Sequence, residues 1–173
     1  MAGKTSSRVI ASAALMTALV YVMTSISIRM PPPLGVWHIG DVASFVAGIL
    51  FGPVVGAFAC GVGATLFDVW NPLWGSSFIT WAPATLVIRS VMGLLLGRYR
   101  RLIKRNTVLS DLGVMIAAHL WKNLVYFLYD YYLFGAVAYL DLATFFLLTA
   151  VDIAVTIPLL GAIRKALGRE YIM

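Results

Sequence analysis

The feature that most constrains this fold is a run of 26 residues without a formal charge, from Val42 to Phe67. Gly52-Pro53 interrupts the run near its middle, and proline is favoured at the first position of a helix. The pattern therefore predicts two consecutive apolar helices, 41–51 and 53–70, joined at Gly52. Both are short for a bilayer crossing, so the pair is either slightly re-entrant or draws flanking residues into its helices.

The whole chain is as apolar as this run. Hydrophobic residues make up 61% of the 173 residues and charged residues only 12%, whereas charged residues are about a quarter of an ordinary soluble sequence. The mean hydropathy is +0.92. Lipid must therefore surround most of the surface, and we predict an all-α integral membrane protein with one domain, 1–173, and six transmembrane helices. The other four predicted spans are 9–28, 81–97, 112–134 and 142–163.

Prolines, glycines and charges set the expected helix ends. Asp41 is placed to cap the second helix, and Pro83 lies in the first turn of the fourth. The basic residues between 98 and 105 should stop the fourth helix. Gly135 should separate the last two helices, and Pro158 should bend the sixth.

The distribution of lysine and arginine predicts the orientation. With both termini in the cytoplasm, ten of the thirteen basic residues lie on the cytoplasmic side, and the outer loops keep only Arg29. This bias predicts six helices with N-in and C-in topology in the cell membrane. The clustering of these charges between apolar runs also argues against a nucleic-acid-binding face. The ten cytoplasmic residues are Lys4, Arg8, Arg98, Arg100, Arg101, Lys104, Arg105, Arg164, Lys165 and Arg169.

The fifth helix has one polar face. Five polar residues at helical offsets of 0, 3, 4, 7 and 11 fall on one side of a helical wheel: His119, Lys122, Asn123, Tyr126 and Asp130. In lipid this face must turn inward, either toward a ligand cavity or as a polar seam that holds the bundle together.

Two further charges lie near the middle of predicted spans, Arg89 in the fourth and Asp152 in the sixth. An unpaired charge at that depth is very costly, so we expect these two to pair, or either to pair with Lys122. The pair either holds the structure or contacts a ligand. Two cations against one anion would leave about one positive charge for a substrate carboxylate or phosphate.

The predicted outer mouth collects acidic and aromatic residues. Four ionisable residues, His38, Asp41, Asp68 and Asp130, occur there with the tryptophans Trp37, Trp70, Trp74 and Trp81. Trp70 and Trp81 fit an interfacial belt. Trp37 and Trp74 occur in loops with proline and glycine, and we expect them to help cover a flat, aromatic ligand.

Other chemistries are less well supported. His38, Asp41 and His119 suggest a metal site, but His38 should lie at the outer edge and His119 in the inner half of its helix, so we expect no metal and no cofactor. A membrane enzyme acting on a lipid-borne substrate would need paired carboxylates, yet Asp68, Asp130 and Asp152 lie on separate helices. A structural or assembly subunit, whose buried charges pair only with one another, is the other alternative.

Small residues predict close helix contacts. Gly48, Gly52 and Gly56 recur every four positions, and Ala14-x-x-x-Ala18 gives the first helix a small-residue face. Such faces allow helices to approach closely within the bundle or against a partner.

Several of these motifs occur together in one known family. In order, they are the Ala14-x-x-x-Ala18 face, His38-x-Gly40-Asp41, Phe51-Gly52-Pro53-x-x-Gly56, the glycine-rich third helix, Trp81-Ala82-Pro83, and Arg89 to Gly93. In this order, chain length and helix number, the sequence resembles the S component of energy-coupling factor (ECF) transporters, of the riboflavin-transporter-like group.

The resemblance implies a function and partners. Such S components are not enzymes; they capture a vitamin or related micronutrient outside the cell and deliver it inward with a transmembrane coupling subunit and two ATPases. It implies that Ala14 and Ala18 face the coupling subunit, that the loop from Pro31 to Gly40 is a gate, and that the outward halves of the last three helices form the pocket. Arg89 stands where lysine is more usual. Riboflavin-like ligands fit the aromatic mouth, and anionic vitamins such as pantothenate or a folate fit the cations. The predicted substrate-binding residues are Trp37, His38, Asp41, Asp68, Trp74, Trp81, Arg89, Lys122, Asn123, Tyr126, Asp130 and Asp152.

Overall fold

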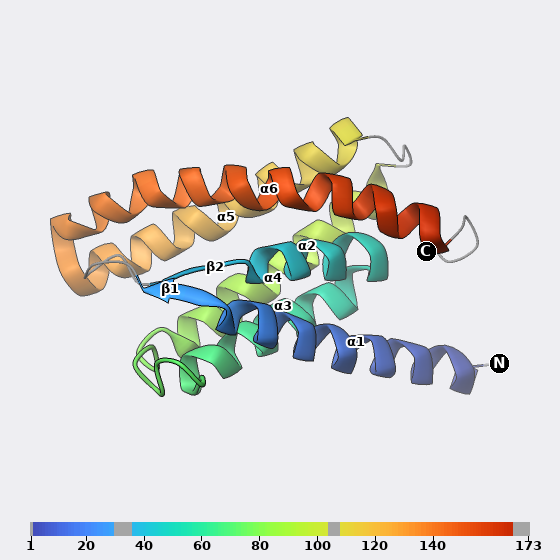
Figure 1. The fold of residues 1–173 in the computed structure, drawn as a ribbon, viewed down its shortest axis with the longest axis horizontal. Helices are drawn as coiled ribbons and strands as arrows, with labels where there is room; N and C mark the ends of the chain where they lie inside the picture. Colours follow the sequence, from blue (N-terminus) through green and yellow to red (C-terminus); the bar gives the residue numbers. More distant parts are fainter. Residues whose placement is uncertain (1, 30–35, 104–107, 168–173) are drawn as a thin grey trace.

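A computed structural model describes residues 2–29, 36–103 and 108–167, which form a helical bundle (Figure 1). Two three-residue strands and one 3-10 turn accompany the α-helices. In chain order the elements are α1 (Ala2–Ser25), β1 (Ser27–Arg29), β2 (Val36–His38), α2 (Gly40–Phe51), α3 (Pro53–Val69), α4 (Ala82–Leu102), α5 (Val108–Phe134), η1 (Gly135–Ala138) and α6 (Tyr139–Leu167).

The long helices run along the length of the molecule. α1 begins and α6 ends at the same end, whereas the β1–β2 hairpin and the α5–α6 connection lie at the opposite end (Figure 1). Within the part of the chain that the structure describes, three segments are long and apolar enough to cross a membrane by length and composition, 7–25, 108–138 and 144–166, and α2 and α3 are shorter apolar helices.

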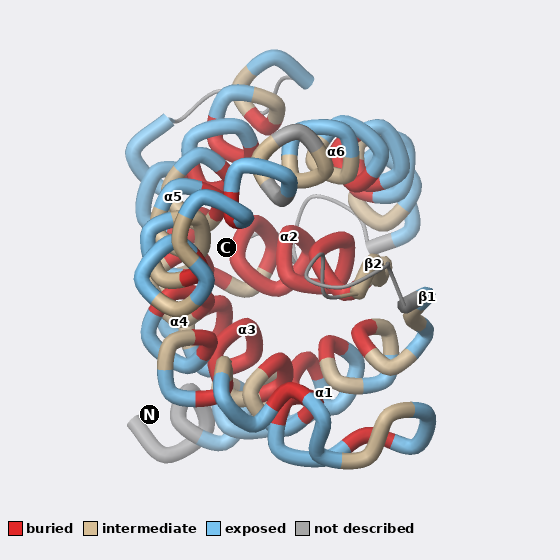
Figure 2. The backbone as a smooth tube through the Cα atoms, turned by 90° about the vertical axis from the view of Figure 1, so that its left-hand side faces the viewer, coloured by how far each residue is buried: buried red, intermediate tan, exposed pale blue. Residues whose placement is uncertain are grey.

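α2 is the centre of the bundle. Eleven consecutive residues, Gly40 to Leu50, are buried, and Figure 2 shows α2 in the buried colour while the surrounding helices expose their outer faces. With 12 residues it is only about 18 Å long. A helix that is buried all round has no polar face, which explains why its sequence reads as a continuous apolar run.

Glycines bring α2, α3 and α4 together along a line that we call the glycine seam, composed of Gly48, Gly56, Gly93 and Gly97. A Cβ added at Gly93 would lie 2.1 Å from the carbonyl oxygen of Gly56, and one at Gly97 would lie 2.2 Å from the Pro53 nitrogen. A Cβ at Gly56 would meet the Gly48 Cα at 2.7 Å. The seam confirms the close contact predicted from the spacing of Gly48 and Gly56.

The turn between α2 and α3 requires glycine. Gly52 has a φ of 90°, which side-chain-bearing residues rarely adopt, and Pro53 begins α3. Gly135, with a φ of 64°, breaks the chain after α5 in the same way.

The hairpin between α1 and α2 was not predicted. β1 and β2 pair antiparallel, with Ser27 opposite His38 and Ile28 opposite Trp37. The first helix therefore ends at Ser25 and does not continue to Ile28, because residues 27–29 bond to β2. The hairpin places Trp37 and His38 directly before α2.

Two further predictions about helix ends are wrong. Asp41 does not cap α2: Ile39 is the N-cap residue and makes no side-chain capping bond, because the Asp41 carboxylate pairs with other helices. The basic residues do not stop the fourth helix, which continues to Leu102. Arg100 is buried against Asp111 of α5, with Nε 3.2 Å from Oδ1, so it stabilises the helix end. Arg164 of α6 also bonds Asp111 through two nitrogens.

Candidate functional site

A cavity of about 140 Å³ lies where α2 to α6 and β2 meet. Ten of the predicted substrate-binding residues line it: Trp37, His38, Asp41, Asp68, Trp81, Arg89, Lys122, Tyr126, Asp130 and Asp152. The lining therefore combines aromatic rings with charged and hydrogen-bonding groups, which is the usual composition of a small-molecule site.

Asp41 of α2 is the centre of a charge cluster beside this cavity. Arg89 of α4 pairs through Nη2 with Oδ1, and Lys122 of α5 pairs through Nζ with Oδ2. The side chain of Asp41 is 2% exposed and that of Arg89 is 4% exposed. Each carboxylate oxygen thus has its own cation. We call Asp41, Arg89, Lys122 and His119 the Asp41 cluster.

This arrangement corrects the predicted pairing. Arg89 pairs with Asp41 and not with Asp152, because α2 is short and its first turn lies level with the middle of the long helices. For the same reason Asp41 is not at the outer mouth. The prediction of one surplus cation is also wrong, because it leaves out Asp41, whose two oxygens bond Arg89 and Lys122.

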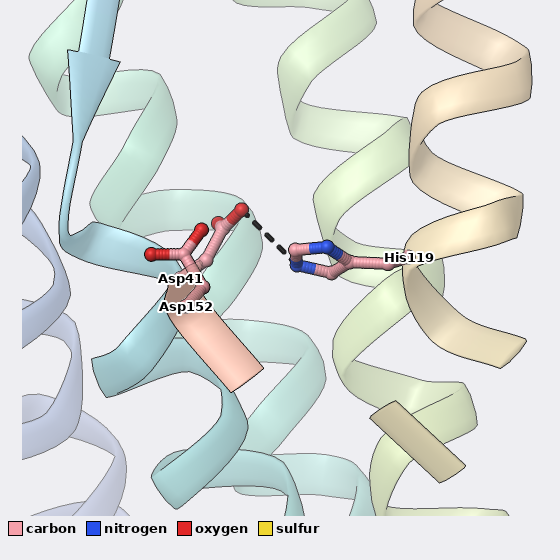
Figure 3. A group of neighbouring side chains, drawn as sticks. All are labelled: Asp41, His119 and Asp152. Atoms are coloured by element: carbon pink, nitrogen blue, oxygen red, sulfur yellow. Dashed lines mark ion pairs between the residues drawn. The ribbon is translucent and has the colours of Figure 1, made fainter. Parts of the chain in front are cut away.

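His119 and Asp152 complete the surroundings of Asp41. His119 Nε2 lies 3.2 Å from Asp41 Oδ2, and single ligand atoms of Asp41, His119 and Asp152 all lie within 4.8 Å of one another (Figure 3). His38, which the metal argument separated from His119 by depth, does not belong to this group, whereas Asp41 does. Both Asp41 oxygens already bond cations, and the positive charges of Arg89 and Lys122 oppose a metal ion here.

The polar face of α5 divides between two neighbours. Lys122, Tyr126 and Asp130 line the cavity. Asn123 turns toward α6, where its Nδ2 donates to Thr149 Oγ1 at 3.0 Å, and His119 Nδ1 lies 2.7 Å from the same oxygen. Asn123 does not line the cavity, because this bond directs its amide to the helix interface.

Hydrogen bonds connect α5 to the first turns of α4 and to its N-cap residue beside the cavity. The Trp81 indole donates to Asp130 Oδ1 at 2.8 Å, and the Tyr126 hydroxyl donates to Thr85 Oγ1 at 2.9 Å. Trp81 was assigned to an interfacial belt as well as to the site. Its bond to a buried carboxylate supports the position in the site.

Several polar atoms in the cavity wall have no hydrogen-bond partner among the described residues. They are the donors Trp37 Nε1 and Arg89 Nε, and the acceptors Asp68 Oδ2 and Asp152 Oδ1. Buried polar groups are normally satisfied. These atoms therefore offer a ligand both donors and acceptors.

His38 lies in the cavity wall in its neutral form. Burial lowers the pKa of His38 to about 3, although the nearby Asp41 carboxylate acts in the opposite direction. Its Nδ1 accepts a hydrogen bond from the Gly40 backbone N–H at 3.2 Å. His38 therefore presents an uncharged ring beside Phe67, whose ring centre is 6.2 Å away.

Trp74 differs from the predicted lid residue. It does not line the cavity, and its indole donates to Ser27 Oγ of β1 at 2.9 Å. Trp37, by contrast, lines the cavity from β2. The predicted gate, Pro31 to Gly40, falls partly on residues 30–35, which lie outside the described residues.

Eight lining residues were not predicted, and helical spacing from charged residues could have found three of them. Thr85 precedes Arg89 by one turn, Ala64 precedes Asp68 by one turn, and Leu148 precedes Asp152 by one turn on α6. The eight are Thr24, Val36, Ala64, Phe67, Phe78, Thr85, Phe145 and Leu148.

Comparison with known proteins identifies the family to which the chain belongs. Residues 4–165 match the family of the ECF-type riboflavin transporter, S component. An uncharacterized protein in gap 3'region of Pyrococcus woesei is 36% identical over 81 residues, which are 46% of this chain and 51% of that protein. The chain therefore spans about half the length of this curated relative.

The family match covers nearly the whole chain, and the chain belongs to the ECF S component family. Members of this family are transporter subunits and not enzymes, and the apolar helices of this chain are those of a multi-pass membrane protein.

Proposed function

We propose that this S component captures an uncharged, flat heteroaromatic vitamin of the riboflavin type from outside the cell. The observation that carries the proposal is a cavity with aromatic walls whose two cations already pair with a protein carboxylate. The family's description, a riboflavin transporter component, points to the same ligand class.

The aromatic walls suit a flat ring. Trp37, Phe67, Phe78 and Trp81 line the cavity, and the Phe67 and Phe78 rings stack at 5.6 Å between centres. Ring-on-ring contacts prefer flat partners. The free donors and acceptors described above suit a ring system that carries both N–H and C=O groups.

The charges argue against an anionic vitamin. Pantothenate or a folate would bring a carboxylate to a cavity whose Arg89 and Lys122 are already paired with Asp41. A buried anion without a free cation is costly. A neutral ligand avoids that cost.

Binding to the purified protein tests this proposal. When riboflavin binds the detergent-solubilised chain, its own fluorescence should be quenched. The melting temperature of the protein should also rise, since a ligand at 100 times its Kd stabilises the folded state by about 2.7 kcal/mol. Thiamine, pantothenate and folate are the comparison ligands. If riboflavin produces no stabilisation and another vitamin does, the ligand class is wrong.

We also propose the topology and its orientation, with six spans and both termini in the cytoplasm. Support comes from α1 and α6, which begin and end at one end of the molecule (Figure 1), where Arg98, Arg100 and Arg164 provide positive charge. Cysteine labelling can test this in a Cys60→Ser background. A membrane-impermeant maleimide should label a cysteine at Ser77 in intact cells, and one at Ser7 only after the membrane is opened.

Delivery would require a transmembrane coupling subunit and two ATPases. Ala14 and Ala18 are exposed on α1, and their small side chains would let a partner helix approach closely. The double variant Ala14→Leu/Ala18→Leu should lose co-purification with these subunits and keep ligand binding. Ala154→Leu, an exposed alanine on α6, is the control and should keep both.

A further inference from the structure

We infer that Asp41 sets the charge selectivity of the cavity, by occupying the position between Arg89 and Lys122 that a ligand carboxylate or phosphate would otherwise take. This inference rests on the proposed function in one respect, that the cavity binds a ligand. It adds the residue that decides which ligand charge is accepted.

The geometry at Asp41 is that of a bound anion. Its two oxygens face a guanidinium from α4 and an ammonium from α5, and these are the groups with which proteins bind carboxylates and phosphates. The carboxylate reaches them from α2, the central helix. Asp41 therefore acts as a built-in counter-ion whose position is fixed by the fold.

The remaining charges of the lining do not favour a second anion. Asp130 Oδ1 already accepts from the Trp81 indole, while Asp68 Oδ2 and Asp152 Oδ1 have no hydrogen-bond partner within the described ranges. A phosphate entering the cavity would meet these carboxylates and two cations that are already paired. Its desolvation would have no compensating ion pair.

Removing the Asp41 charge should reverse this preference. Asp41→Asn keeps the size of the side chain and leaves the charges of Arg89 and Lys122 uncompensated. Both cations line the cavity, so an anion inside the cavity could then pair with them. A gain of anion binding is a sharper result than a loss, because damage to the fold does not produce it.

The first experiment needs no vitamin. Inorganic phosphate, titrated at constant ionic strength, should stabilise the purified Asp41→Asn variant against thermal unfolding and leave the wild type unchanged. Asp152→Asn is the matched control: it also removes one carboxylate from the cavity, but Asp41 still pairs with both cations, so this variant should not respond to phosphate. An equal response of wild type and Asp41→Asn would overturn the inference.

The second experiment compares two forms of one ring, riboflavin and riboflavin 5′-phosphate. The wild type should prefer riboflavin by at least about 100-fold in Kd, and Asp41→Asn should reduce this ratio at least tenfold. An unchanged ratio in a variant that binds both would contradict the role of Asp41. Absence of flavin binding by the wild type would overturn the proposed ligand alone, because the phosphate titration still decides the role of Asp41.

A second variant covers the case in which Asp41→Asn does not fold. Asp41→Asn/Lys122→Gln removes one cation with the carboxylate, so the net charge of the cluster is conserved and only Arg89 is left to bind an anion. It should be stabilised by phosphate more strongly than the wild type. No response in this folded double variant would count against the inference.

Discussion

The two parts of the bundle are held together by different means. α2, α3 and α4 meet along the glycine seam, where backbones touch directly. α5 and α6 join the rest mainly through side chains: α5 reaches α4 by the Trp81–Asp130 and Tyr126–Thr85 bonds, and α2 by Lys122–Asp41. An added Cβ at Gly113 of α5 or Gly161 of α6 would meet nothing within 4 Å.

This difference in helix packing explains where the cavity lies. Helices in backbone contact leave no room between them, so a ligand site cannot form along the glycine seam. Longer polar side chains hold α5 away from α4 and α2, and the space between becomes the cavity. We therefore expect changes in the seam to affect folding, and changes at the α5 interface to affect ligand binding as well.

The largest effect should come from Gly93→Ala in the seam. The new Cβ would lie 2.1 Å from the Gly56 carbonyl oxygen, which is backbone and cannot rotate away. We expect destabilisation of at least about 3 kcal/mol and little folded protein in size-exclusion chromatography. Gly113→Ala, with open space on α5, is the control and should be neutral or stabilise by up to about 1 kcal/mol. Equal recovery of both variants would remove the contrast between the two regions.

The next largest effect is expected for Arg89→Met in the Asp41 cluster. Loss of one partner leaves Asp41 buried with less compensation, which typically costs about 3–5 kcal/mol. Thermal unfolding measures this loss, and riboflavin binding should fall at the same time. Arg98→Met replaces an exposed arginine of the same helix and should change stability by less than about 0.5 kcal/mol. A small effect of Arg89→Met would mean that the pair contributes little to holding α2 and α4 together.

Combining Arg89→Met and Lys122→Met with Asp41→Leu removes the carboxylate together with both of its cations and separates support from binding. If the three charges were purely structural, the triple variant would recover stability and keep the ligand, because apolar residues can replace buried ion pairs. We expect it to recover stability and lose the ligand. This combination is informative because Asp41, and not Asp152, is the ion-pair partner of Arg89.

The glycine seam and the Asp41 cluster could each be predicted from sequence only in part. The recurrence of Gly48, Gly52 and Gly56 predicts close packing whatever the depth of the helix, and Gly48 and Gly56 do lie in the seam. Gly52 lies at the turn instead, and the contribution of Gly93 and Gly97 was not predicted. The partner of Arg89 depends on where each helix sits along the bundle axis. Hydropathy does not encode that position when all neighbouring helices are apolar. The short α2 places Asp41 level with the middle of α5, and no local pattern shows this.

A moderate effect is expected from Trp81→Phe, which keeps an aromatic ring and removes the donor to Asp130. An unsatisfied buried acceptor costs about 1–3 kcal/mol, and riboflavin affinity should fall several-fold because both residues line the cavity. Trp121→Phe is the matched control. It removes the α5-to-α4 bond from Trp121 Nε1 to the Ile88 carbonyl, 3.1 Å long, and Trp121 does not line the cavity. It should lower stability similarly and leave the Kd unchanged; equal changes in Kd would show that binding follows stability alone.

The smallest effect concerns pH and His38, a half-buried residue of β2 that lines the cavity. Its pKa in the folded protein is about 3, below the ordinary value near 6.5, so the unfolded chain binds a proton at mildly acidic pH and the folded chain does not. His38 therefore does not affect the free energy of unfolding above about pH 6.5. As the pH falls from there toward 3, His38 lowers this free energy by at most about 1.4 kcal/mol per pH unit. Comparing melting temperatures at pH 7.5 and 5.0 isolates this contribution, because His38→Gln should lose less stability on acidification than the wild type. Since His38 stays neutral in the folded protein across this range, it should add no pH dependence to riboflavin affinity. A parallel decline of both proteins would place His38 in contact with water and outside the packed region.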